Sequence, residues 1–329
     1  MKTDLYVNCN TGEIACQEEI ALEDGRRDWR KRKIMSFDVA RLMKRYDPER
    51  AARIKGCGTY LEFAKTPDGR QNLHRANFCR ERLCPMCQWR RSIKLRAQAE
   101  QIYSVECARG YQHVFVTLTW RNCSGKELTK TVSAMIEAAQ RWKRTTLYKN
   151  AFRGSYRALE ITYNEKRRDF HPHLHYIMTV DGNYFDRKNQ DYVTTEKLID
   201  SWKRASRIDY DPSVSIEAVY TKPGQTMTGA LAEISKYPAK TAEVKSSKVL
   251  QAIDYALRGR RLIQWGGITA DIRSELGQDD IESGNLIQTT ETAGDESIEK
   301  IVYIWRYGYY IPVDYKAVQE MQKKAETGK

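Results

Sequence analysis

The sequence predicts an α+β fold in which helices flank a central antiparallel sheet, preceded by a cysteine-rich, zinc-binding N-terminal region. Three observations predict it. Strand-like and helix-like segments follow one another between residues 113 and 237. Three of the five histidines lie on one strand-like segment, between His171 and His175. Four cysteines with the spacing of a metal site precede these segments.

Size and charge limit the possible functions. The chain has 329 residues and 41% hydrophobic content, enough for packed cores. A net charge of +13 and a pI near 9.3 predict a polyanionic partner, with nucleic acid as the first candidate, because neutralised phosphates release counterions. The 20 tyrosines suit stacking on unpaired bases. No apolar run approaches the roughly 20 residues that span a bilayer, and no signal peptide is evident, so we expect a cytoplasmic protein with no membrane partner.

Two basic helices are expected in the N-terminal third. Residues 26–55 are dense in Arg and Lys and carry a partly helical apolar pattern. A second basic helix is expected directly after Cys87, at residues 89–96. For the first helix, a solvated face is the alternative to DNA contact. The candidate DNA-binding residues are Arg30, Lys31, Arg32, Lys33, Trp89, Arg90, Arg91 and Lys94.

The cysteines before the second helix predict a structural zinc site. Cys84 and Cys87 form a CxxC knuckle, and Cys57 and Cys79 complete the all-cysteine set that structural Zn²⁺ prefers. Because the gap after Cys57 is long, His74 is an alternative fourth ligand. A redox pair or ordinary buried cysteines is the other interpretation.

The central segments predict the sheet. Their order of strand, helix, strand, strand, helix, strand, helix is close to the ferredoxin-like pattern. The expected strands are residues 113–120, 156–163, 172–180 and 214–220, and the second and third form a hairpin across a polar turn. The expected helices are residues 128–142, 194–206 and about 227–237.

The C-terminal part divides into two. After Gly267 the composition turns acidic and polar, which suggests a linker. Aromatic residues return at 303–310 and predict a strand that folds back onto a domain. We therefore expect an N-terminal region at 1–105, a catalytic domain at 106–270, and a linker with an aromatic segment at 271–329.

The histidine strand predicts a metal site. His173 and His175 point to one face of a strand and form a chelating pair. Glu160, on the other strand of the expected hairpin, is the best third ligand, and the resulting set accepts Mg²⁺ or Mn²⁺ with open positions. The alternative is two histidines that pack or face solvent.

Tyr237 is the candidate nucleophile. On a helix, Glu233 and Tyr237 share one face, and Pro238 ends or kinks the helix just after the phenol. Lys236 and Lys240 favour the phenolate, so covalent phosphoryl transfer is chemically accessible. The alternative is a tyrosine packed at a helix end.

Three motifs in this order resemble those of HUH endonucleases. They are Val-Phe-Val-Thr-Leu-Thr at 114–119, His-Pro-His-Leu-His at 171–175 and Glu-Ile-Ser-Lys-Tyr-Pro-Ala-Lys at 233–240. With the cysteine block at 78–91, they resemble in particular the rolling-circle replication initiators of small Gram-positive plasmids.

The resemblance implies an HUH nuclease fold, which is ferredoxin-like or RRM-like, with a role for each motif. His173 and His175 would hold the metal, Tyr237 would be the single nicking tyrosine, and Glu233 would direct water during termination. Glu160 as third ligand rests on its strand position more than on a motif.

The implied function is sequence-specific, metal-dependent nicking at a plasmid double-strand origin whose nick site is single-stranded. The enzyme would keep a 5′-phosphotyrosine link while the free 3′-OH primes synthesis, with a host helicase and polymerase as partners. The alternatives are an HUH transposase or relaxase acting on a different DNA, and a non-catalytic zinc-containing DNA-binding regulator.

Overall fold

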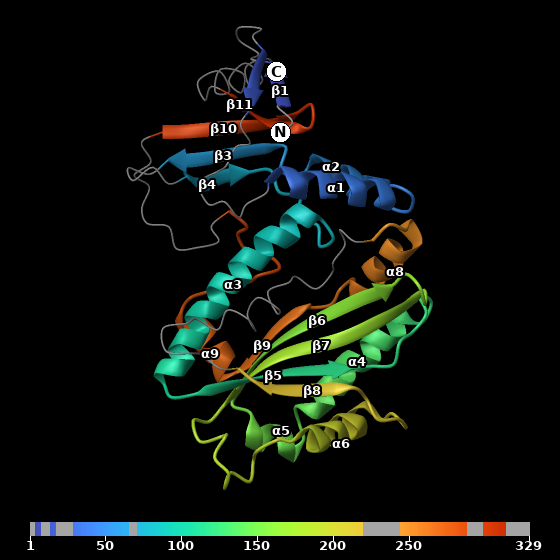
Figure 1. Cartoon of the computed structure of the whole chain (residues 1–329), viewed down its shortest axis with the longest axis vertical. Helices are drawn as coiled ribbons and strands as arrows, with labels where there is room; N and C mark the ends of the chain where they lie inside the picture. Colours follow the sequence, from blue (N-terminus) through green and yellow to red (C-terminus); the bar gives the residue numbers. More distant parts are fainter. Residues whose placement is uncertain are drawn as a thin grey trace.

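The structure is a computed structural model that describes residues 4–7, 14–17, 29–65, 71–219, 244–287 and 299–313. Within these residues the strands form antiparallel sheets of two, four and five strands, and helices flank the larger two (Figure 1). The predicted α+β class with antiparallel sheets is therefore confirmed. No helix in these ranges combines the length and apolar character needed to cross a membrane.

The five-stranded sheet carries the histidine strand near its centre. Its strand order is β8-β5-β7-β6-β9, and every neighbouring pair is antiparallel. The strands are β5 (Gln112–Thr119), β6 (Gly154–Asn164), β7 (Asp169–Val180), β8 (Val214–Ala218) and β9 (Ile263–Gly267). The four predicted strands and the predicted β6–β7 hairpin are confirmed.

Strand β9 is an additional edge strand that the sequence pattern did not predict. Two of its five residues are glycines, which weaken a strand signal. Gly267 is required here, because its φ of 58° is in the left-handed region and a Cβ atom would collide with the carbonyl oxygen of Arg153. The sharp turn at Gly267 allows a helix to begin at the next residue.

Helices cover one face of this sheet, and aromatic side chains pack between the helices and the strands. Trp142 packs edge-on against Tyr176 of β7 and against Trp202, with ring centroids 5.6 and 6.3 Å apart, and its indole N–H donates to Ser201 Oγ at 3.1 Å. The helices on this side are α4 (Leu128–Trp142), α5 (Thr146–Ala151), α6 (Thr195–Ser206) and α8 (Ser247–Leu257). The helices predicted at 128–142 and 194–206 are confirmed.

On the opposite face, α3 (Pro85–Ala108) and α9 (Ile268–Glu275) cover the Thr179 end of β7. The buried Glu106 carboxylate accepts hydrogen bonds from Thr179 at 3.1 Å and Thr269 at 2.6 Å, and it lies 2.6 Å from His113 Nε2. The histidine end of the same face carries the candidate site described below.

The N-terminal part is built on the four-stranded sheet, whose order is β11-β10-β3-β4. Strands from both ends of the chain therefore share one sheet (Figure 1). The expected return of residues 303–310 onto a domain is confirmed, but they form a hairpin that turns at Tyr307 and Gly308, and not the single strand that we expected. Its elements are α1 (Trp29–Met43), α2 (Pro48–Gly56), β3 (Tyr60–Lys65), β4 (Gln71–Ala76), β10 (Glu299–Arg306) and β11 (Tyr309–Val313). A separate two-stranded sheet pairs β1 (Asp4–Val7) with β2 (Ile14–Gln17).

A partly buried arginine joins the two parts. Arg50 of α2 donates two hydrogen bonds to Asp254 of α8, at 2.6 and 3.0 Å, and one to Glu81 of the cysteine block at 2.9 Å. Bidentate pairing of this kind fixes orientation as well as distance. These hydrogen bonds therefore hold the cysteine block and α8 in a fixed position relative to each other.

The acidic segment after Gly267 does not form a linker over residues 268–287. It begins with α9, and its acidic side chains pair with basic residues of the cysteine block and α3: Glu282 with Arg82 at 2.8 Å, and Asp279 with Lys94. Ile281 is buried between them. The acidic composition of this segment predicted a solvent-exposed linker. Composition alone does not show that these acidic side chains pair with basic residues elsewhere in the chain.

Candidate functional site

The structure brings the predicted metal-binding residues together on the β6–β7 hairpin. Glu160 and His173 are direct cross-strand partners, and His175 lies two residues further along β7. The Nε2 atoms of His173 and His175 lie 3.1 and 3.2 Å from Glu160 Oε2. One ligand atom from each residue lies within 4.8 Å of the other two, and all three residues are largely buried. The two strands thus hold three donors around one point.

Hydrogen bonds on the far side of each imidazole fix its orientation. His173 Nδ1 lies 3.1 Å from the backbone carbonyl oxygen of His171. Because a carbonyl only accepts, Nδ1 donates this hydrogen bond, and Nε2 is the ring nitrogen that faces Glu160. His175 Nδ1 lies 3.1 Å from Thr117 Oγ1, and its ring stacks on Phe115. Such outer contacts are typical of imidazoles that ligate metals.

The charge of the group suits a hard divalent cation. Burial alone would raise the pKa of Glu160, but the hydrogen bonds and charges of His173 and His175 outweigh it and lower the pKa well below its ordinary value. The carboxylate is therefore ionised at neutral pH. One carboxylate and two imidazoles leave coordination positions open, so the donor set fits Mg²⁺ or Mn²⁺.

His171 lies beside this group rather than in it. Its Nδ1 contacts Asn122 Oδ1 at 2.7 Å, and its ring centroid is 5.3 Å from that of His173. Burial and the neighbouring charge of His173 lower its pKa. Through its carbonyl oxygen, His171 orients His173.

The candidate nucleophile falls in a part of the chain that is not described. Tyr237, Glu233, Lys236 and Lys240, and the helix expected at about 227–237, all lie outside the described residues. The two ends that flank this motif are described. Val219 follows β8 at one edge of the sheet, where its N–H donates to His113. Val244 lies beside β6, so these ends flank the strands that carry the candidate metal ligands.

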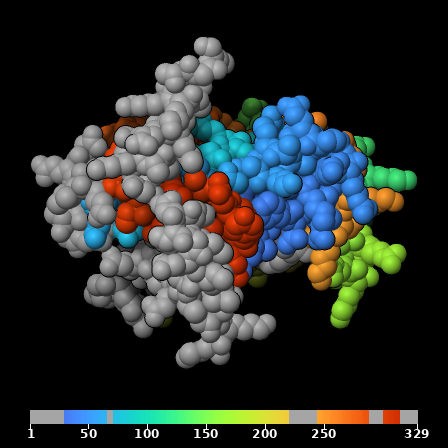
Figure 2. Space-filling model, turned by 90° about the horizontal axis from the view of Figure 1, so that it is seen from above, coloured from blue at the N-terminus to red at the C-terminus, as the bar shows by residue number. Residues whose placement is uncertain are grey.

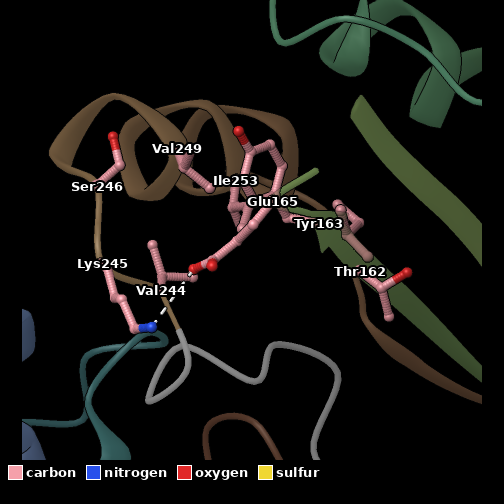
Figure 3. Close-up of a pocket in the computed structure, with 9 residues that line it drawn as sticks. Thr162, Tyr163, Glu165, Val244, Lys245, Ser246, Val249 and Ile253 are labelled. Carbon is pink, nitrogen blue, oxygen red and sulfur yellow. Dashed lines mark ion pairs between the residues drawn. The ribbon is translucent and has the colours of Figure 1, made fainter. Parts of the chain in front are cut away.

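A pocket of about 370 Å³ lies between the end of β6 and the start of α8 (Figure 3). Its walls are mostly apolar, and Lys245 and Glu165 form an ion pair at 3.9 Å across its mouth. Thr162 also contributes to the wall, and its hydroxyl donates to the carbonyl oxygen of His171 at 3.4 Å. Thr162 and His173 thus share the carbonyl oxygen of His171, so two hydrogen bonds link the pocket wall to the metal-binding group.

The four predicted cysteines also meet. Cys87 Sγ lies 3.6 Å from Cys57 Sγ and 3.8 Å from Cys79 Sγ, and with Cys84 all four sulfurs lie within 4.8 Å of one another. Burial opposes ionisation of Cys84, but hydrogen bonds from the other three thiols lower its pKa. Four sulfurs in this arrangement, three of them on buried residues, fit the closed tetrahedral coordination of structural Zn²⁺.

Lys33 and His74 lie differently relative to the cysteine cluster. Lys33 Nζ donates to the carbonyl oxygens of Lys55 and Cys57, at 2.7 and 2.5 Å, and so packs against the cluster. His74, the alternative ligand, instead lies 3.8 Å from Glu62 and is 40% exposed. His74 is therefore not part of the cluster.

Four of the basic residues expected to contact DNA are structural. Arg90, Arg91, Lys94 and Lys33 are buried. The three on α3 donate to carbonyl oxygens of the packed segments, at 2.7 to 2.9 Å: Arg90 to Leu286 and Ile287, Arg91 to Arg80, and Lys94 to Asn285. The prediction that these four side chains face DNA is wrong, because all four are buried and donate hydrogen bonds inside the protein.

The remaining candidates differ in exposure. Trp89 is half-buried and packs edge-on against Trp29 with centroids 4.6 Å apart. Arg32 is half-buried, whereas Arg30 and Lys31 are exposed. The sequence did contain a pattern that predicts burial of the basic residues of α3. They share one side of the helix with the apolar residues Leu95 and Ala99, and that side faces inward.

An ionised carboxylate and two oriented imidazoles on an antiparallel sheet, in a strongly basic chain, define a candidate metal-dependent protein that acts on nucleic acid. Comparison with known proteins gives the family. The family model described as "Replication protein" matches residues 70–315. The chain belongs to this family, and its resemblance to plasmid replication initiators is confirmed.

The relatives cover most of the chain. A "Protein rep" from Streptococcus pneumoniae serotype 2 is 34% identical over 88% of this chain and 93% of its own length. A "Protein rep" from Bacillus amyloliquefaciens is 36% identical over 81% and 87%, and one from Lactiplantibacillus plantarum is 32% identical over 84% and 90%. No solved structure matches the chain.

Proposed function

We propose that this replication protein initiates rolling-circle replication by nicking one strand of a plasmid double-strand origin. The observation that carries the proposal is the group of Glu160, His173 and His175, which is assembled and oriented on the central hairpin of a family member. The five-stranded sheet would be the core of an HUH nuclease domain at residues 106–270.

The three ligands would hold Mn²⁺ or Mg²⁺, which when bound polarises the scissile phosphate and offsets its developing charge. Glu160 contributes the negative charge, while Thr117 and the His171 carbonyl keep both imidazoles aimed at one point. Rigid strands suit this task, because small displacements of ligating groups cost catalysis heavily.

Tyr237 would act as the nucleophile. Its phenolate oxygen attacks the phosphorus, the bond from phosphorus to the 3′-oxygen breaks, and the proton lost by the phenol is recovered by that oxygen. The products are a 5′-phosphotyrosine link and a free 3′-OH that primes synthesis. Lys236 and Lys240 favour the phenolate, and Glu233 directs water in the second cleavage.

The described flanks of the tyrosine motif support this assignment. Val219 lies at the β8 edge and Val244 beside β6, on either side of the strands that carry His173, His175 and Thr117. Val244 places one end of the motif beside β6, which carries Glu160, whereas Val219 lies at the His113 end of the sheet.

The N-terminal cysteines would hold a structural Zn²⁺. Its role would be to fix the end of α2, which Cys57 follows, against the start of α3, which contains Cys87. The expected partners are plasmid origin DNA, single-stranded at the nick site, and a host helicase and polymerase in the cytoplasm.

The test is formation of a covalent adduct. Purified protein is incubated with single-stranded origin DNA and Mn²⁺, and adducts are resolved on a denaturing gel. The wild type and Tyr255→Phe, a matched control at an exposed tyrosine of α8, are expected to form the adduct. Tyr237→Phe and wild type with chelator are expected to form none. DNA binding with no adduct in any metal would favour a non-catalytic zinc-containing regulator.

A further inference from the structure

The first turn of α1 breaks a local rule of helix stability. Its basic residues run consecutively from Arg30 to Lys33, and it contains no acidic residue. The N-terminus of a helix carries partial positive charge, so cations there are unfavourable by a few tenths of a kcal/mol each. The one acidic residue of α1 is Asp38, which pairs with Arg41 further along the helix. Positive charge is thus concentrated at the N-terminus against the local preference.

The turn between β10 and β11 breaks a second local rule. Arg306 and Tyr309 close this two-residue hairpin, and Tyr307 and Gly308 form the turn with φ values of 52° and 86°. Asn or Gly normally occupies the first of these positions, because a large side chain there is strained. The Tyr307 side chain does not gain by packing, since the residue is 87% exposed. A strained aromatic left in solvent indicates a requirement other than folding.

The two anomalies meet on one surface. The Arg30 guanidinium lies 4.3 Å from the centre of the Tyr309 ring, and its Nε donates to the carbonyl oxygen of Gly308 at 3.0 Å. Figure 2 shows the red strands β10 and β11 against the blue helix α1 on one face of the molecule. We call Arg30, Lys31, Arg306, Tyr307 and Tyr309 the hairpin-tip surface. Sites where several local preferences fail together are expected to be functional.

We propose that the hairpin-tip surface binds double-stranded DNA next to the nick site. Arg30, Lys31 and Arg306 would contact backbone phosphates, and Tyr307, the most exposed large hydrophobic side chain in the described ranges, would insert at the groove. The surface is distinct from the basic face of α3, whose cations are buried. It rests on the family's role in replication and does not depend on the nicking chemistry.

The position of the surface favours duplex DNA over the single strand at the nick. The hairpin-tip surface belongs to the four-stranded sheet, and the metal-binding group belongs to the five-stranded sheet, with α3 running between them (Figure 1). A strand cleaved at Glu160, His173 and His175 would therefore reach this surface only through flanking DNA. In an origin, that flanking DNA is duplex.

The test measures equilibrium binding to a mixed-sequence duplex and to its single strand, by fluorescence anisotropy over a range of salt. For Lys31→Ala combined with Arg306→Ala, we expect the slope of log K against log salt for the duplex to fall by about two. For Tyr307→Asn we expect roughly tenfold weaker duplex binding with an unfolding midpoint unchanged or higher, because Asn tolerates the left-handed conformation.

The controls separate this proposal from the nuclease proposal. Lys188→Ala removes an exposed cation between β7 and α6 and is expected to bind the duplex as the wild type does. The hairpin-tip variants are expected to form the covalent adduct with single-stranded DNA normally. Unchanged duplex binding in both hairpin-tip variants, or a loss confined to single-stranded DNA, would overturn the proposal and leave the nuclease proposal standing.

Discussion

The two candidate metal centres differ in how the chain builds them. The cysteine cluster draws Cys57, Cys79, Cys84 and Cys87 from connections and helix ends, and all four donors are sulfur. The Glu160 group draws its donors from two paired strands, mixes oxygen with nitrogen and supplies three ligands among the described residues. Closed sulfur sites stabilise folds, whereas open mixed sites on rigid strands leave room for substrate. On the function that we propose, the cysteine cluster stabilises the fold and the Glu160 group carries the chemistry.

The largest expected effect comes from breaking the cysteine cluster. Without Cys84 and Cys87, the remaining thiols cannot hold Zn²⁺, and the chain around α3 loses its anchor. For Cys84→Ser combined with Cys87→Ser, we expect zinc to be absent and stability to fall by about 5 kcal/mol or more, comparable to the stability of a whole domain. Metal analysis measures the zinc content, with the exposed Cys107→Ser as its control, and thermal unfolding measures the stability. Freshly purified wild type without zinc would contradict the assignment.

Breaking the Glu160 group should instead reduce nicking and leave the stability of the fold unchanged. Glu160→Gln removes the ionised oxygen ligand and keeps the shape of the side chain. We expect nicking to fall roughly 100-fold or more while folding and duplex binding are retained. The matched control is Glu165→Gln at the end of β6, which removes a carboxylate outside the ligand group. A nicking rate for Glu160→Gln within a few-fold of that for Glu165→Gln would remove Glu160 from the site.

A smaller effect concerns the second carboxylate–imidazole pair on the same face of the sheet. Burial would lower the pKa of His113, but hydrogen bonds to Cys107 and Glu106 outweigh it and raise the pKa. A raised folded pKa adds stability that is fully present below the ordinary value of about 6.5 and is lost as pH rises through the folded value. We therefore expect the unfolding midpoint to fall as pH rises above about 6.5, and Glu106→Gln to flatten this dependence. The exposed His74→Gln should retain the wild-type slope.

Much of the candidate site could be predicted because it depends on local order. Alternation along β7 places His173 and His175 on one face, and the short polar turn after β6 sets the register that puts Glu160 opposite His173. The helices α4 and α6 could also be predicted from the sequence, because their apolar periodicity is strong.

What could not be predicted depends on contacts between distant segments. The pairing of Glu299 with Lys65 joins strands from the two ends of the chain, and no local pattern encodes it. The burial of Arg90 and Lys94 also requires the later segment that supplies their carbonyl partners. Local patterns therefore give the sign of a charge but do not give its partner.

The central claim is that the metal-binding group serves a tyrosine nucleophile. Its most direct test is mass spectrometric mapping of the covalent product formed with single-stranded origin DNA and Mn²⁺. We expect a nucleotide attached through its 5′-phosphate to the phenol oxygen of Tyr237. Attachment at any other residue, or cleavage of DNA that leaves no covalent product, would contradict it.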